Sequence, residues 1–83
     1  MNTKQQQAAP LINIRIDGTH FQVHQNELTG TALKQLAGIP AANLLFREVH
    51  GPGEDEQIQN ETIVQLKSGD AFYEMPPGNF GLI

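Results

Sequence analysis

The sequence has 83 residues, and five basic against nine acidic side chains give it a formal net charge of −4. A chain of this length builds one small domain with a single core. Apolar residues at 39% and aromatic residues at 6% predict a compact core of Ile, Leu, Val and Phe. The acidic balance argues against nucleic acid as a ligand, because phosphate binding relies on clustered Lys and Arg.

The sequence contains no cysteine, which excludes a disulfide, a thiolate metal site and a cysteine nucleophile. No apolar run reaches the length of a membrane span, and residues 1–7 are polar, unlike the hydrophobic segment of a signal peptide. We therefore expect a soluble, cytoplasmic protein that has no membrane partner and needs no cofactor or metal.

The first half of the chain predicts a hairpin. Residues 1–10 are rich in Gln and Ala and show no periodic pattern, so we expect a disordered segment there. Residues 12–16 then alternate isoleucine with polar side chains, which is typical of a half-buried strand. The turn pair Asp17-Gly18 and a second alternating run over residues 19–23 indicate an antiparallel partner.

A helix of about two turns follows. Residues 29–38 place Leu and Ala side chains at helical spacing. Thr29 or Thr31 is expected to cap its start and Gly38 its end. Pro40 prevents any continuation.

A third strand is expected over residues 44–49, with Leu44 and Phe46 on one face and Leu45 on the other. Residues 51–56 contain two glycines, a proline and three acidic side chains, so they predict a flexible acidic loop.

The last part of the domain is expected to be a short irregular crossover over residues 58–70, followed by a strand over residues 71–75. A two-stranded hairpin cannot bury its apolar face alone, so the natural solution is a mixed sheet of four to five strands wrapped around the single helix. The first and last strands then pair in parallel at the centre. The predicted fold is an α+β β-grasp domain over residues 11–75.

Residues 76–83 are expected to form a flexible tail. Pro76 and Pro77 remove two backbone donors and end the strand in an extended form. Gly78 and Gly81 have no side chain, so the tail can thread a narrow channel. The functional interpretation is that this tail carries the chemistry, and the other interpretation is a frayed terminus.

Four segments resemble the bacterial multiubiquitin-type ubiquitin-like domain: IRIDG at residues 14–18, LTGTALKQLAGIP at 28–40, GDAF at 69–72 and PPG at 76–78. The resemblance extends over residues 11–81. It implies a bacterial ubiquitin-like modifier that works with an activating enzyme, a conjugating enzyme and a JAB-type metallopeptidase. Such systems are associated with antiphage defence.

The sequence lacks the terminal Gly-Gly pair of eukaryotic ubiquitin. Removal of Leu82 and Ile83 makes Gly81 the conjugation terminus, whereas earlier cleavage makes it Gly78. We favour Gly81, because six residues beyond Met75 reach about 21 Å when fully extended and three reach about 11 Å.

The remaining site predictions follow from this interpretation. Tail recognition is expected from the residues that precede the conjugation terminus: Pro76, Pro77, Gly78, Asn79 and Phe80. Leu45 and Tyr73 are the expected partner-docking surface. Lys4, Lys34 and Lys67 are candidate acceptor lysines, and Lys4 is preferred because a mobile amine reaches a thioester most easily.

The histidines and the acidic loop are better explained as solvated side chains. His20 and His24 lie roughly 13 Å apart along a strand, too far for one metal ion. His50 has no partner at a recognisable spacing. The acidic loop lacks the alternating oxygen ligands of a calcium site.

The chain is therefore expected to be a modifier and not an enzyme, since it has no nucleophile–base pattern and no phosphate loop. Its tail is trimmed, adenylated and passed as a thioester to a target protein. Two alternatives stay open. One is a sulfur carrier whose terminal glycine becomes a thiocarboxylate, and the other is a non-covalent β-grasp interaction module.

Overall fold

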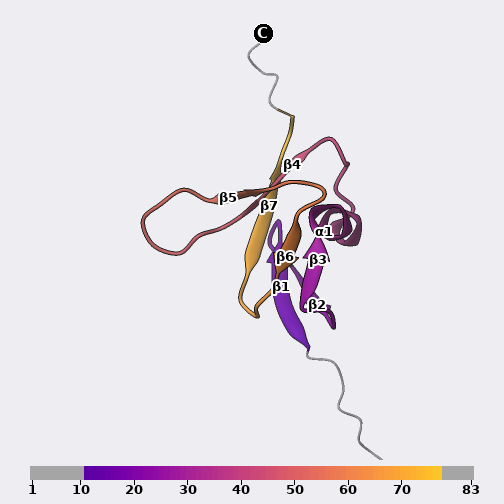
Figure 1. The fold of residues 1–83 in the computed structure, drawn as a ribbon, viewed down its shortest axis with the longest axis vertical. Helices are drawn as coiled ribbons and strands as arrows, with labels where there is room; N and C mark the ends of the chain where they lie inside the picture. Colours follow the sequence, from indigo (N-terminus) through magenta and orange to yellow (C-terminus); the bar gives the residue numbers. More distant parts are fainter. Residues whose placement is uncertain (1–10, 78–83) are drawn as a thin grey trace, which may run out of the picture.

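The computed structural model describes residues 11–77 and contains one α-helix and seven β-strands in that range. The elements are, in chain order, β1 (Ile12–Ile16), β2 (Thr19–Val23), β3 (Glu27–Thr29), α1 (Gly30–Ala37), β4 (Leu44–Arg47), β5 (Glu56–Ile58), β6 (Ile63–Gln65) and β7 (Ala71–Met75). Five strands form a mixed sheet in the order β2-β1-β7-β4-β5, and β3 pairs with β6 in a second, two-stranded sheet (Figure 1). The predicted β-grasp architecture is confirmed.

The N-terminal hairpin has the predicted turn. Asp17 and Gly18 both have positive φ, at 54° and 79°, which is the backbone of a two-residue turn that matches the twist of the strands. β1 pairs antiparallel with β2 and parallel with β7. The parallel ladder is made by hydrogen bonds from the Arg15 and Asp17 amides to the carbonyl oxygens of Asp70 and Phe72, at 3.0 and 2.9 Å.

Local capping chemistry sets both ends of α1. The Thr29 hydroxyl oxygen accepts a hydrogen bond from the Ala32 amide at 3.1 Å, as expected of an N-cap. Thr31 is not the cap, and its hydroxyl donates to the Asn60 carbonyl instead. Gly38 adopts a left-handed conformation with φ 72° and ends the helix. The predicted helix and both of its ends are confirmed.

The core lies between α1 and one face of the five-stranded sheet, which we call the inner face. Ile12, Ile14 and Ile16, the alternate residues of β1, point into it, together with Leu45 of β4 and Leu33 of the helix. The buried apolar side chains are Ile12, Ile14, Ile16, Val23, Leu33, Ile39, Leu45, Ile58, Val64, Leu66 and Phe72. The opposite face of the sheet, the outer face, has no helix over it among the described residues (Figure 1).

Two sequence predictions on the second half of the domain are wrong in detail. The third strand ends at Arg47, two residues early, because the Val49 amide donates to the Asp55 side chain and not to a neighbouring strand. Residues 58–70 are not irregular throughout, since β6 pairs antiparallel with β3. Three-residue strands carry too little alternation to be recognised in a sequence.

Lys34 is buried, with 5% of its surface exposed. Its ammonium donates to the Ala41 carbonyl at 3.0 Å, to the Asn43 carbonyl and to the Asn60 side-chain oxygen at 2.7 Å. The side chain therefore ties α1 to the segment that follows it and to the turn before β6. Because the Lys34 ammonium is buried and hydrogen-bonded within the domain, it is not available for conjugation. The prediction that Lys34 is a candidate acceptor lysine is therefore wrong.

No helix in residues 11–77 is long and apolar enough to cross a membrane.

Replacement of Lys34 by methionine is expected to lower the free energy of unfolding by about 1–3 kcal/mol, because three part-buried acceptors lose their donor. Urea denaturation followed by far-UV circular dichroism measures the loss. The control is Lys67→Met at an exposed position, which is expected to change stability by less than about 0.5 kcal/mol. Equal losses in the two variants would contradict the assigned role of Lys34.

Candidate functional site

The C-terminal strand carries the chain out of the domain. β7 lies in the middle of the five-stranded sheet, parallel to β1 on one side and antiparallel to β4 on the other. It ends at Met75, and the exposed Pro76 and Pro77 follow it away from the sheet (Figure 1). These two prolines are the last described residues. Gly78, Asn79, Phe80 and Gly81, which were predicted as tail-recognition and conjugation residues, lie outside the described residues, as does Lys4.

Four apolar side chains meet on the outer face where β7 ends. Leu44 is opposite Met75 and Phe46 is opposite Tyr73 in the β4–β7 ladder. The Phe46 and Tyr73 rings are stacked, with centroids 5.4 Å apart and an interplanar angle of 12°. Met75 is 41% exposed and the other three are half-buried. We call Leu44, Phe46, Tyr73 and Met75 the apolar strip.

The structure corrects one of the two predicted docking residues. Leu45 is 0% exposed and belongs to the core, so its assignment to a docking surface is wrong. Neighbouring residues of a strand point to opposite faces, so burial of Leu45 places Leu44 and Phe46 on the outer face. Tyr73 lies on the outer face beside Phe46. The separation of Leu45 from Leu44 and Phe46 was predicted, but the solvent-facing side was assigned incorrectly.

Asp55 attaches the loop between β4 and β5 to the apolar strip. One carboxylate oxygen accepts from the Val49 amide at 2.9 Å and the other from the Tyr73 hydroxyl at 2.7 Å. The hydrogen bond from the Val49 amide, followed by that from Tyr73, holds the pKa of Asp55 below its ordinary value. The same carboxylate raises the pKa of Tyr73, because it stabilises the protonated phenol.

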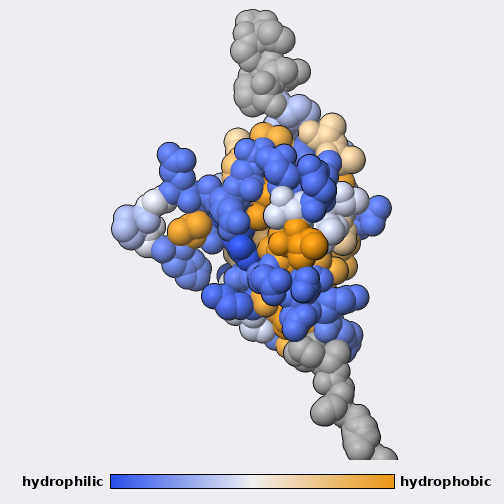
Figure 2. All heavy atoms as spheres, in the orientation of Figure 1, coloured by the Kyte–Doolittle hydropathy of each residue, from blue (hydrophilic) through white to orange (hydrophobic). Residues whose placement is uncertain are grey.

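This loop was predicted as a solvated acidic turn, and the contact with Tyr73 was missed. No feature of the sequence pairs a loop carboxylate with a tyrosine 18 residues later. Residues 48–55 project from the body of the domain at the left of Figure 1, and the space-filling view shows them as mostly hydrophilic (Figure 2). The contact with Tyr73 fixes the base of this projection next to the apolar strip.

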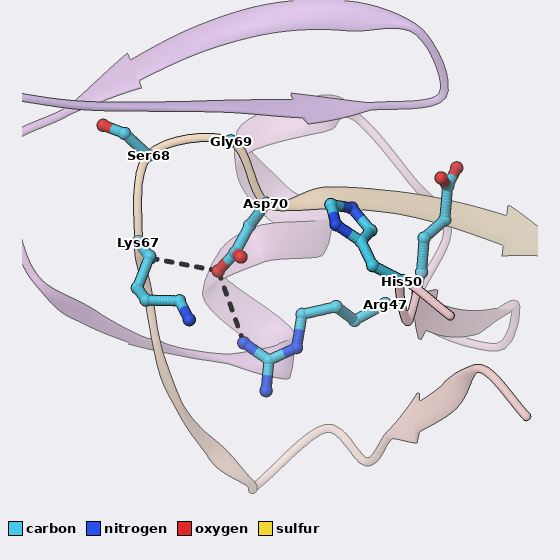
Figure 3. Close-up of a pocket in the computed structure, with 7 residues that line it drawn as sticks. Arg47, His50, Lys67, Ser68, Gly69 and Asp70 are labelled. Carbon is cyan, nitrogen blue, oxygen red and sulfur yellow. Dashed lines mark hydrogen bonds and ion pairs between the residues drawn. The ribbon is translucent and has the colours of Figure 1, made fainter. Parts of the chain in front are cut away.

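A polar cavity of about 420 Å³ lies at the opposite end of β7 (Figure 3). Its walls come from the end of β4 and from the turn before β7, and they include Arg47, Glu48, His50, Lys67, Ser68 and Asp70. The Arg47 guanidinium is already paired, with Glu56 at 2.8 Å and with Asp70 at 3.4 Å. Its charge is therefore compensated by these two carboxylates.

The described histidines hold no metal-binding arrangement. His20 bonds through Nε2 to the Asn13 side-chain oxygen at 3.1 Å, and the same oxygen accepts from the Gln22 amide at 2.9 Å. Within residues 11–77, no group of three or more His, Asp, Glu or Cys side chains is placed to share one metal ion.

The hydrogen bond from the Tyr73 hydroxyl to Asp55 predicts how the ionisation of Tyr73 changes when Asp55 is replaced. Tyr73 is the only tyrosine of the sequence, which has no tryptophan, so its phenolate absorbance can be titrated without interference. In Asp55→Ala, the pKa of Tyr73 is expected to fall toward the ordinary value of about 10, because the carboxylate that stabilises the protonated phenol is gone. Glu54→Ala, one residue away in the loop, is the control and should leave the titration unchanged. An unshifted midpoint in Asp55→Ala would show that the hydrogen bond is not formed in solution.

The contribution of Asp55 to folding stability depends on pH over a defined range. Because the folded-state pKa of Asp55 is lowered, its contribution to stability is present above the ordinary carboxyl pKa of 3.8 and is lost as the pH falls through the folded-state value.

Comparison with known proteins agrees with the topology. Searches of curated proteins and of solved structures returned no match to this chain. Residues 12–74 match the model of the multiubiquitin family, and this range contains all seven strands and the helix except for the last residue of β7. The chain belongs to the multiubiquitin family.

Proposed function

We propose that this chain is a protein modifier whose C-terminal tail is the reacting group. One observation carries the proposal: β7 is held by strands on both sides and ends at Met75, beside the partly exposed apolar strip. A modifier needs a rigid domain for recognition and a narrow C-terminal tail for the reaction. Here the apolar strip of the rigid domain lies directly beside the start of the tail. Membership of the multiubiquitin family supports the same reading.

The reaction sequence would require no catalytic residue from this domain. A JAB-type metallopeptidase cleaves after Gly81, with Gly78 as the alternative terminus. An activating enzyme joins the new carboxylate to AMP from ATP with release of pyrophosphate, and its cysteine thiolate then displaces AMP to form a thioester. A conjugating enzyme accepts the acyl group by thiol exchange and transfers it to an amine of the target protein. We place this reaction in bacterial antiphage defence.

The tail sequence suits such a reaction. Pro76 and Pro77 favour an extended backbone without internal hydrogen bonds. Gly78 and Gly81 add no side-chain bulk, so they pass through a channel that leads to a buried cysteine. Asn79 and Phe80 between them supply the polar and apolar contacts by which an enzyme distinguishes this tail from others.

The apolar strip would be the docking surface for the activating enzyme. It lies next to the last described residues of the tail, and no helix among residues 11–77 covers it. Aromatic side chains are enriched among residues that dominate binding energy, because they bury a large area at a low entropic cost. Phe46 therefore replaces Leu45 as the partner of Tyr73 in the proposed docking surface.

The first test is the intact mass of the chain after incubation with ATP, the metallopeptidase and the activating enzyme. We expect cleavage after Gly81 and then a thiol-sensitive adduct with the activating enzyme. Gly81→Ala should abolish the adduct, and Gln35→Ser on the exposed face of α1 is the control that should retain it. Replacement of the terminal oxygen by sulfur would instead identify a sulfur carrier. A mass that does not change with ATP would favour a non-covalent module and reject the proposal.

The second test concerns the apolar strip. Phe46→Ser should raise the KM for this chain in the activation reaction about tenfold, equivalent to about 1.4 kcal/mol of lost binding free energy, with kcat nearly unchanged. Gln35→Ser on the exposed face of α1 is the control. Unfolding curves of both variants establish that the assay temperature lies below their transitions. An unchanged KM in folded Phe46→Ser would place the docking surface elsewhere.

A further inference from the structure

β7 extends past the end of its parallel partner. The β1–β7 ladder stops at the pair of Ile16 and Phe72, because the chain reverses direction in the Asp17-Gly18 turn. The Phe72 carbonyl faces β1, since it accepts from the Asp17 amide at 2.9 Å. Alternate residues of a strand direct their N–H and C=O groups to the same side. The Glu74 amide therefore faces this side too, beyond the last residue of β1.

The Asp17 side chain takes the place that the next residue of a strand would have. Its Oδ1 atom accepts a hydrogen bond from the Glu74 amide at 3.0 Å, across 57 positions of the sequence. We call this hydrogen bond the Asp17 anchor. On the other side of β7, Glu74 is opposite Leu45 of β4, and its carboxylate accepts from the Asn43 side-chain amide at 2.8 Å. Glu74 is therefore held from both sides.

The Asp17 anchor is the last attachment of the chain on the β1 side before the tail. The Met75 N–H points the other way, toward β4, because successive residues of a strand alternate. Pro76 and Pro77 have no N–H. Among residues 11–77, Glu74 therefore has the last backbone donor that faces this side. Loss of the anchor would free the end of β7 on one side and leave the apolar strip in place.

The turn and the anchor place different requirements on residue 17. Asp17 has a φ of 54°, and Gly, Asn and Asp are the residues that adopt this backbone most readily. The turn therefore accounts for any of these three residues. The Glu74 amide requires a side-chain oxygen in addition, which glycine lacks. Substitutions at this position can thus remove the anchor and keep the turn.

We propose that Asp17 is a positioning residue for the modifier reaction, because it anchors the end of β7 and so fixes the direction in which the tail starts. The inference rests on the proposed function, since it concerns delivery of the tail to the activating enzyme. An error in direction grows along the chain: about 20° at the start moves the end of an extended six-residue segment by about 7 Å. The reaction depends on close placement of the reacting atoms. The anchor therefore acts on the chemical step, whereas the apolar strip acts on binding.

The first measurement is hydrogen exchange at single amides of the full-length chain, followed by NMR. Asp17→Gly keeps the turn and loses the acceptor, so exchange at the Glu74 amide is expected to rise about tenfold. Asp17→Asn keeps a side-chain oxygen and should retain most of the protection. Exchange at Ile14 in the hairpin reports any general loss of stability. Unchanged exchange at Glu74 in Asp17→Gly, or an equal rise at Glu74 and Ile14, would overturn the inference.

The second measurement is the rate of the ATP-dependent adduct with the activating enzyme. In Asp17→Gly we expect kcat to fall about fivefold and KM to change less than about twofold, because the apolar strip is intact. Asp17→Asn should restore most of the kcat. An unchanged kcat in Asp17→Gly, or a rise in KM alone, would overturn the inference.

Thr31→Val is the matched control for both measurements. It also removes a side-chain hydrogen bond to the backbone, from Thr31 Oγ1 to the Asn60 carbonyl at 3.1 Å, but between α1 and the turn before β6. Exchange at Glu74 and kcat should both stay at the values of the unsubstituted chain. A loss of kcat equal to that of Asp17→Gly would contradict a specific role of Asp17.

The two proposals fail separately. An adduct that forms at the same kcat in Asp17→Gly and in the unsubstituted chain would retain the modifier function and refute the positioning role. Absence of any adduct with the unsubstituted chain would refute the modifier function and, with it, the role of Asp17 in activation. The exchange rates at Glu74 would then still decide whether Asp17 anchors the end of β7.

Discussion

The parallel pairing of β1 with β7 is the constraint on which the rest of the structure depends. It joins residues 56 positions apart, Arg15 with Ala71 and Ile16 with Phe72. Without it, the N-terminal hairpin and the β4–β5–β7 group would be separate two- and three-stranded pieces, each with one apolar face exposed. The pairing also puts the last strand in the middle of the sheet, so strands on both sides fix the direction in which the tail leaves.

The parts of the fold that local chemistry determines could be predicted from the sequence. Alternation over residues 12–16, the Asp17-Gly18 turn, the Thr29 cap and the Gly38 stop each depend on neighbouring residues, and each is found in the structure. The face of β4 could not be predicted in this way. Three apolar residues in succession carry no alternation, so only the register with β7 decides that Leu45 is inside.

The contacts of charged residues were harder to predict from the sequence than the helix and strand signals. Lys34 is buried and Asp55 is exposed, but the contacts of both were missed, because a sequence does not show which acceptors or donors the fold brings to a charged group. The acceptors of Lys34 come from residues up to 26 positions away, and the donor to Asp55 comes from 18 positions away. The need for glycine at position 30 could not be predicted from the sequence either. A Cβ there would lie 2.2 Å from the Gln59 carbonyl oxygen, and helix propensity does not reveal this contact.

The two faces of the sheet differ in what covers them, and this difference connects the fold to the proposed function. The inner face is occupied by the core, so the proposed function assigns recognition to the outer face and to the ends of β7. The tail root and apolar strip lie at one end, and the Lys67 turn and its cavity lie at the other. Under the proposed function, an enzyme bound at the apolar strip would hold the start of the tail at one end of β7 and leave the turn at the other end uncovered.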